Sequence, residues 1–224
     1  MLGLLHTSPV HVPVFDALRD ADAPGLPLRH RVRPELLAAA RESGPGGVAE
    51  EVAEEVAEAV GALARDGARA VLCTCSTLGD VAEAAGAAAG VPVLRVDRPM
   101  AAEAVAAGPR LAVLATVEST LAPTTELIAD EARRAGRPAE VRTVLVPDAW
   151  ERFQNGDREG SLAAVVAAVR RERAAGGIDA LVLAQASMAP AVERLVDDGH
   201  PGAGVPVLAS PRSGLRAAAV LAGR

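Results

Sequence analysis

The sequence predicts an α/β protein of two pseudo-symmetric lobes, each a parallel sheet flanked by helices, with a site in the cleft between them. Short apolar segments alternate with longer amphipathic ones along the whole chain. The second half repeats the pattern of the first at a shift of about 110 residues. Hydroxyl-rich turns follow the apolar segments in both halves. Parallel sheets hold their ligands at such turns, so both halves are expected to contribute to one site.

The first lobe is expected to span residues 1–107. Its strands are predicted at Leu2–Leu5, Leu26–Val32, from Ala70 to the turn at Cys75, and over Gly90–Val96. Helices are predicted over Val12–Arg19, from Pro34, over Val48–Arg65, from Asp80 and over Pro99–Ala107. Glycines and a proline at 44–47 indicate a loop.

The segment Val48–Arg65 gives the clearest helix. Apolar residues recur at helical spacing, at Val48, Val52, Val56, Val60 and Leu63, with glutamates between them. We expect its apolar stripe to pack on a sheet and its acidic face to be solvated.

The second lobe is expected to span residues 108–207, with the segment 208–224 packing back on the first. Three correspondences define it: Leu2–Thr7 with Leu111–Thr116, Gly67–Thr77 with Gly177–Ser187, and the Gly-Val-Pro-Val-Leu runs that start at Gly90 and Gly204. A further strand is predicted over Val141–Val146. In this alignment Cys75 corresponds to Gln185, and the two face each other across the predicted cleft.

Composition limits the function. The 29 acidic and 23 basic residues give a net charge of -6 and form no basic stripe, so nucleic acid is not an expected partner. The N-terminal apolar run is too short for a signal or a membrane span, and we expect a cytoplasmic protein without a membrane partner. Two cysteines one residue apart suit neither a disulfide framework nor a metal site.

Cys75 is the main candidate for chemistry. It lies where a buried strand meets a helix, a position whose backbone N–H groups and helix dipole make a thiol easier to ionise. Cys73 is expected to be a core thiol. Hydroxyls placed to hold a carboxylate follow the strands of both halves, at Ser76, Thr77, Thr116, Ser119, Thr120 and Ser187. Each could instead cap a turn or a helix.

His6 is the candidate for a second proton carrier, because it directly follows the first strand and could act as acid, base or thiolate partner. A hydrogen-bonded structural histidine is the alternative. His11 and His30 are weaker candidates, and His200 lies in a Gly/Pro loop and is expected to face solvent.

Two motifs resemble the aspartate/glutamate racemase superfamily, which includes hydantoin racemases, maleate isomerases and arylmalonate decarboxylases. Cys75-Ser76-Thr77 resembles the Cys-Asn-Thr turn of its first lobe, and the run Leu183–Ala189 resembles its Leu-Gly-Cys-Ala-Gly-Met-Ala. The resemblance implies a small carboxylate or amino acid as substrate and no pyridoxal phosphate, metal or nucleotide cofactor. It also implies substrate contacts from Thr7, Ser76, Thr77, Thr116, Ser119, Thr120, Gln185, Ala186 and Ser187.

The chain departs from the family pattern at Gln185, which stands where the second cysteine is expected and cannot exchange a proton near neutral pH. The favoured hypothesis is therefore a racemase-type isomerase with one thiol, Cys75, and His6 or water as second proton carrier. A one-thiol decarboxylase and a carboxylate- or partner-binding protein without turnover are the alternatives. A homodimer is compatible with the sequence.

Overall fold

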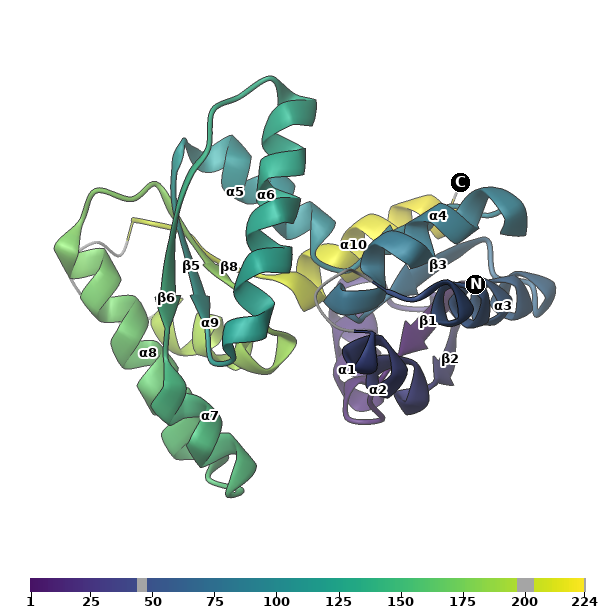
Figure 1. Cartoon of the computed structure of the whole chain (residues 1–224), viewed down its shortest axis with the longest axis horizontal. Helices are drawn as coiled ribbons and strands as arrows, with labels where there is room; N and C mark the ends of the chain where they lie inside the picture. The colour runs from purple at the N-terminus through teal and green to yellow at the C-terminus, as the bar shows by residue number, and fades with distance from the viewer. Residues whose placement is uncertain (44–47, 197–203, 224) are drawn as a thin grey trace. The chain divides into compact units, whose positions relative to one another are not determined.

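The structure is a computed structural model that describes residues 1–43, 48–196 and 204–223. The chain divides into two compact units, the first made of Met1–Asp97 with Pro211–Arg224 and the second of Arg98–Ser210 (Figure 1). Among the described residues, each unit contains a four-stranded parallel sheet with helices around it. This confirms the predicted α/β fold with two similar halves. The loop predicted at 44–47 and His200 lie outside the described residues.

The sheet of the first unit has the strand order β2-β1-β3-β4. Its strands are β1 (Leu2–His6), β2 (Leu28–Val32), β3 (Ala70–Cys73) and β4 (Val93–Arg95). Its helices are α1 (His11–Asp22), α2 (Pro34–Glu42), α3 (Glu50–Arg65), α4 (Gly79–Ala89) and α10 (Ser210–Gly223). Helices α2, α3 and α4 share a core with Leu5 and Val71, whereas α1 and α10 share another with Leu4 and Leu72. Successive strand residues point to opposite faces of a sheet, which explains the two cores.

Helix α3 shows how the sequence pattern becomes packing. Val52, Val56, Val60 and Leu63 are all buried against the sheet, while the glutamates between them are exposed. The predicted amphipathic helix is therefore confirmed.

The second unit repeats this arrangement with the strand order β6-β5-β7-β8. Its strands are β5 (Arg110–Ala115), β6 (Glu140–Leu145), β7 (Ala180–Leu183) and β8 (Val207–Ala209). Its helices are α5 (Arg98–Ala107), α6 (Leu121–Ala135), α7 (Pro147–Gln154), α8 (Arg158–Ala175) and α9 (Pro190–Val196). Helices α5 and α6 pack with Val113 and Val182, and α7, α8 and α9 pack with Leu114 and Leu183.

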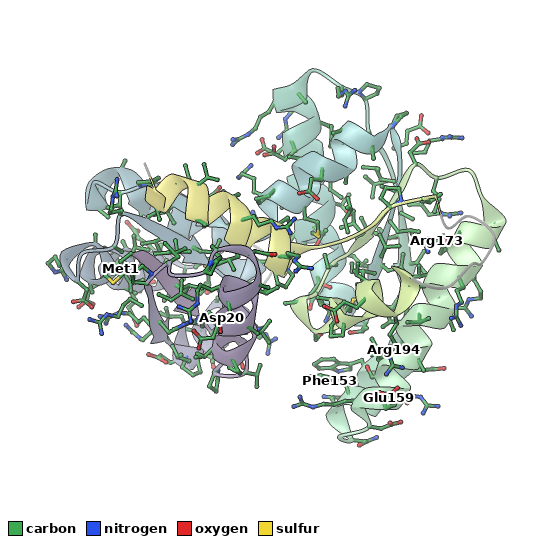
Figure 2. All side chains as sticks on the ribbon, turned by 180° about the vertical axis from the view of Figure 1, so that it is seen from behind. Met1, Asp20, Phe153, Glu159, Arg173 and Arg194 are labelled. Carbon is green, nitrogen blue, oxygen red and sulfur yellow. The ribbon has the colours of Figure 1, made fainter. Side chains whose placement is uncertain are left out.

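Two arginines attach helices to their surroundings in the second unit. Arg173 of α8 donates from Nη2 to the carbonyl oxygen of Val205 at 2.6 Å, just before β8. Arg194 of α9 forms an ion pair with Glu159 of α8, and both side chains are seen at one end of α8 (Figure 2). The first contact ties α8 to the residues before β8, and the second ties α9 to α8.

Strand register places Cys75 and Gln185 at equivalent points. Leu5 pairs with Cys73 in the first unit, and Leu114 pairs with Leu183 in the second. Two residues later, Cys75 (φ -111°, ψ 114°) and Gln185 (φ -127°, ψ 138°) both have extended backbone and both precede a short 3₁₀ helix. The repeat seen in the sequence therefore exists in the fold.

The unit boundaries differ from those drawn on the sequence. Helix α5, which the sequence placed in the first lobe, buries Met100, Ala104 and Val105 in the second unit's core. The C-terminal segment is divided, because β8 completes the second sheet while Leu215 and Ala218 of α10 pack in the first unit. No helix in the described part of the chain is long and apolar enough to cross a membrane.

Candidate active site

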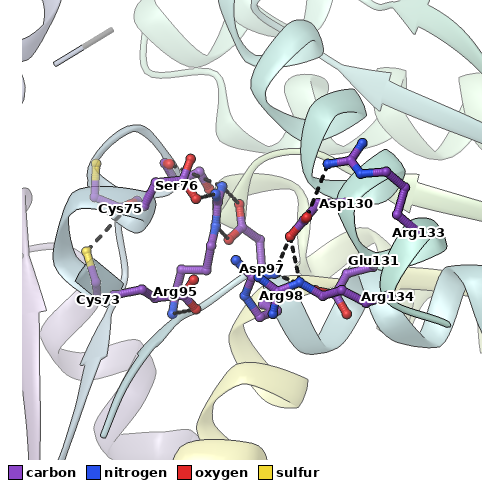
Figure 3. Close-up of polar contacts among 12 residues, drawn as sticks. Cys73, Cys75, Ser76, Arg95, Asp97, Arg98, Asp130, Glu131, Arg133 and Arg134 are labelled. Atoms are coloured by element: carbon purple, nitrogen blue, oxygen red, sulfur yellow. Dashed lines mark hydrogen bonds and ion pairs between the residues drawn. The ribbon is translucent and has the colours of Figure 1, made fainter. Parts of the chain in front are cut away.

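The two thiols of the first unit differ in exposure. Cys73 is the last residue of β3 and is completely buried, and its Sγ donates to the carbonyl oxygen of Cys75 at 3.6 Å (Figure 3). Burial raises the pKa of the Cys73 thiol far above its usual range, and Cys75 raises it further. Cys75 retains 8% exposure. Cys73 is thus the core thiol that the sequence predicted, and Cys75 is the one of the two thiols that keeps some exposure.

The turn after Cys75 carries the two hydroxyl residues named from the sequence. Ser76 and Thr77 lie in the 3₁₀ helix Ser76–Leu78, which leads directly into α4. Ser76 is partly exposed and Thr77 is exposed. Thr7, which follows β1, is nearly buried. The structure therefore brings Thr7, Cys75, Ser76 and Thr77 to the carboxyl ends of β1 and β3, as the parallel sheet requires.

His6 is fully buried, and both of its ring nitrogens have partners. Nδ1 lies 2.7 Å from Thr74 Oγ1, and Nε2 lies 2.8 Å from His30 Nδ1. The Thr74 hydroxyl donates to the carbonyl oxygen of Leu5 at 3.2 Å, so it must accept from His6 Nδ1. His6 Nε2 then accepts from His30. One neutral tautomer of His6 satisfies all of these contacts.

The protonation of His6 agrees with this geometry. Burial, and to a smaller extent the neighbouring His30 and His11, lower the pKa of His6 to about 3. A histidine that is neutral at physiological pH and bonded at both nitrogens offers no nitrogen to a substrate. The structure thus places His6 differently from the sequence expectation of a second proton carrier, because its ring is turned into the protein.

His30 extends the same hydrogen-bonded chain to the surface. Its Nε2 lies 3.3 Å from Asp16 Oδ1, and the Asp16 side chain is 44% exposed. The rings of His6 and His30 are stacked at 5.1 Å between centroids. From the sequence His30 was only a weak candidate. Its place beside His6 follows from the parallel pairing of β1 with β2, which the sequence does not show directly.

Arg95, which the sequence did not single out, contacts the turn that follows Cys75 (Figure 3). Its buried guanidinium donates to both carboxylate oxygens of Asp97, at 2.7 and 3.0 Å, and to Asp80 at 2.6 Å. Its Nη2 also donates to the carbonyl oxygen of Ser76 at 3.3 Å. The Arg95 backbone N–H donates to Glu83. The one sequence signal for this role was the position of Arg95, a charged residue directly after the apolar run Val-Pro-Val-Leu.

Gly79 makes room for this arginine. A Cβ atom at Gly79 would lie 2.7 Å from Arg95 Nε and 2.8 Å from Arg95 Cβ, closer than van der Waals contact allows. The first residue of α4 is therefore a glycine because the helix begins directly on the Arg95 side chain.

The second unit carries a different pair at the equivalent strand ends. Gln185 Oε1 accepts hydrogen bonds from Thr116 N at 2.6 Å and from Thr116 Oγ1 at 2.9 Å. The Thr120 hydroxyl donates to Val117 O within its own turn. Ser119 and Ser187 are exposed, and Ala186 is partly exposed. The structure therefore gathers the predicted residues at the tips of β5 and β7, whereas the cleft between the two units stays a prediction.

Among the residues that the structure describes, no group of three or more His, Cys, Asp and Glu side chains is arranged to hold a metal ion. The candidate residues are a thiol and hydroxyls in the first unit, and hydroxyls and an amide in the second.

Sequence comparison identifies a family. The profile of the family described as Asp/Glu/Hydantoin racemase matches residues 12–218. Comparison with curated proteins gave no match.

Solved structures show the same fold. An aspartate racemase homologue from Pyrococcus horikoshii OT3 has a TM-score of 0.68 at 17% identity, covering 100% of this chain and 99% of its own. A glycine-to-cysteine variant of arylmalonate decarboxylase in a sulfate-associated form has a TM-score of 0.64 at 21% identity, covering 99% and 93%. Glutamate racemase from Aquifex pyrophilus has a TM-score of 0.61 at 17% identity, covering 96% and 81%. At these identities the likeness establishes the fold.

Proposed function

Because the chain belongs to the Asp/Glu/hydantoin racemase family, we propose that it is a cofactor-independent isomerase of a small carboxylate or amino acid, with Cys75 as its single catalytic thiol. The observation that carries the proposal is the contrast between the two thiols. Cys75 is nearly buried, with 8% exposure, at a turn with the more exposed Ser76 and Thr77, whereas Cys73 is completely buried. A thiol that reacts must be reached by both substrate and solvent protons.

In the proposed reaction the Cys75 thiolate removes the proton from the α-carbon of the acid. The C–H bond breaks, the proton moves to Sγ, and the electron pair is delocalised into the adjacent carboxylate. Hydroxyl groups of Ser76 and Thr77 donate to that carboxylate as its charge grows. Return of a proton from Sγ restores the acid. If the thiol proton has first exchanged with D₂O, the acid carries deuterium at its α-carbon.

The second unit lacks a matching acid. Gln185 occupies the position equivalent to Cys75, and an amide neither gives nor takes a proton near neutral pH. His6 is held by Thr74 and His30. Inversion then depends on water as the second proton donor, so we expect exchange on one face to be faster than inversion.

A one-thiol decarboxylase is a second candidate, supported by the structural likeness to an arylmalonate decarboxylase variant. In that reaction the C–C bond of a malonate-type acid breaks and carbon dioxide leaves. The electron pair stays on the α-carbon, which takes the proton of the Cys75 thiol, and water then reprotonates the thiolate. Both reactions use the same thiol and the same carboxylate donors, and they differ in the leaving group.

Deuterium exchange tests the proposal. The full chain is incubated in D₂O with a panel of amino acids and malonate-type acids, and α-proton exchange, inversion and carbon dioxide release are followed. We expect exchange on one face of at least one acid, lost in Cys75→Ser because a hydroxyl is a far weaker base. Cys73→Ala is the matched control and is expected to keep the exchange.

Gln185→Cys tests the predicted cleft. If the tips of both units meet one substrate, the new thiol supplies the missing acid, and inversion rises relative to exchange. Carbon dioxide release without exchange would instead favour the decarboxylase. Exchange that survives Cys75→Ser would remove Cys75 from the mechanism, and binding without turnover of any acid would favour a carboxylate-binding protein.

A further inference from the structure

The side chain of Gln185 is fixed in one orientation by Thr116. Its amide group faces both the backbone N–H of Thr116 and the Thr116 hydroxyl, at 2.6 and 2.9 Å. A backbone N–H can only donate, so the atom that faces it must be the amide oxygen. Both lone pairs of that oxygen are then used, and the amide nitrogen points away from Thr116.

The amide nitrogen is available for another partner. Among the described residues, Gln185 Nε2 donates to no protein acceptor, and Gln185 is partly exposed at the end of β7. Thr116 is buried, with only 6% of its surface exposed. The side chain therefore presents two N–H donors, while its acceptor is occupied by a buried residue that cannot easily move away.

We propose that Gln185 Nε2 binds a carboxylate oxygen of the substrate and that Thr116 is a positioning residue that fixes the amide plane. The class of substrate, a small carboxylic acid, is taken from the proposed function. The new element is that one side chain of the second unit, Gln185, binds the carboxylate. Thr116 was expected from the sequence to bind the carboxylate directly. Its two donors instead hold Gln185.

This arrangement specifies the chemistry of the group that is bound. An amide N–H donor satisfies an anionic oxygen, and hydrogen bonds to charged groups are stronger than those between neutral ones. An ammonium group would leave these donors without an acceptor. The acid must therefore direct a carboxylate oxygen, and not an amino group, towards Gln185.

Malonate serves as the probe, and its binding to the full chain is measured by titration calorimetry. Gln185→Glu keeps the shape and the acceptor that faces Thr116, but it replaces the two donors with a negatively charged oxygen. Gln185→Ala removes the side chain. We expect both variants to bind malonate at least about tenfold more weakly than the unaltered chain does.

Thr116 is tested by a matched pair. Thr116→Val removes the hydroxyl donor and should weaken malonate binding several-fold, whereas Thr116→Ser keeps it and should restore binding. The nuclear magnetic resonance signals of the Gln185 side-chain NH₂ give a second readout. They should shift when malonate binds and should broaden in Thr116→Val, because the amide is then less firmly held.

Tighter malonate binding by Gln185→Ala would overturn the proposal, because it would show that Thr116 is the ligand and that Gln185 only covers it. Unchanged binding by Gln185→Glu, or no binding by the unaltered chain, would also overturn it. These failures are distinct from failure of the proposed function. The latter appears as absence of Cys75-dependent exchange, whatever the malonate affinities.

Discussion

At two equivalent positions near the ends of the central strands, the first unit buries polar side chains and the second unit buries small apolar ones. His6 and Thr74 are hydrogen-bonded to each other beside Cys75. The strand pairings place Ala115 and Ala184 at the equivalent positions of the second unit. Alanine there needs no partner, while every polar group of the first unit must be satisfied.

The neighbouring strand shows the same difference. Arg95 ends β4 and is buried with Asp97, whereas Ala209 ends β8. Burying charges is unfavourable unless they are paired, and the second unit builds the same sheet without them. The fold therefore does not require the buried polar groups. We infer that they serve the thiol turn, whose Ser76 carbonyl Arg95 binds.

The largest expected effect comes from removing one member of the buried ion pair. Arg95→Met leaves the Asp97 carboxylate buried without its partner, and we expect a loss of about 3–5 kcal/mol in the free energy of unfolding. Urea denaturation measures this loss.

The double variant Arg95→Met/Asp97→Leu separates charge from packing. It removes both buried charges, so it should recover most of the stability while the Cys75 turn loses its support. Reaction of Cys75 with iodoacetamide across a pH series reports on that turn. An Arg95→Met variant as stable as the unaltered chain would show that the second unit's apolar arrangement suits the first unit equally well.

A smaller effect is expected from the buried His6. Its pKa is lowered to about 3 in the folded chain, chiefly by burial, while the unfolded value is about 6.5. Between these values the unfolded chain binds more protons, so stability falls as pH falls, by at most about 1.4 kcal/mol per pH unit. His6→Gln removes this dependence. Urea denaturation between pH 7 and 5 measures the difference in the free energy of unfolding between the unaltered chain and His6→Gln. This difference should become smaller as the pH falls.

The second unit supplies the internal comparison for this titration, because Ala115 stands where His6 stands in the first. Burial also lowers the pKa of His11, so His11→Asn is needed to separate its contribution. A slope that is identical with and without His6 would mean that His6 is protonated in the folded chain, contrary to its two hydrogen bonds.

Much of the fold could be predicted because it depends on patterns along the chain. Apolar segments gave the strands, helical spacing gave α3, and the repeat gave the equivalence of Cys75 and Gln185. The boundary drawn on the sequence differs from the division into compact units by helix α5, because a short alanine-rich helix carries no signal for which sheet it covers. Assembly and cellular location stay predictions.

The site was predicted in part, and the missing parts share a physical cause. Cys75 and the hydroxyls lie next to strand ends in the sequence. The pairs His6 with His30, Arg95 with Asp80, and Thr116 with Gln185 form only when separate strands and helices are assembled. In the sequence, Arg95 and Asp80 resemble ordinary solvated charges, and nothing local shows that the arginine is buried.

The two units also differ in continuity, because the first is completed by the C-terminal helix α10 while the second is a single stretch of chain. Asp22 of α1 binds both Arg212 and Arg216 of α10, at 2.7 to 3.2 Å. Hydrogen bonds from Arg212 and Arg216 lower the pKa of Asp22 to about 2. The carboxylate therefore stabilises the fold above about pH 4, and this contribution is lost as pH falls through 2.

The smallest expected effect follows from this contact. Asp22→Asn should loosen α10 without unfolding the rest, so its amides should exchange faster with D₂O at neutral pH, and high salt should reduce the difference because both arginines are half-exposed. Asp179→Asn is the matched control, since Asp179 binds Arg110 within the continuous second unit. It should leave α10 exchange unchanged. Equal exchange of α10 in both variants would show that its apolar residues alone hold it on the first unit.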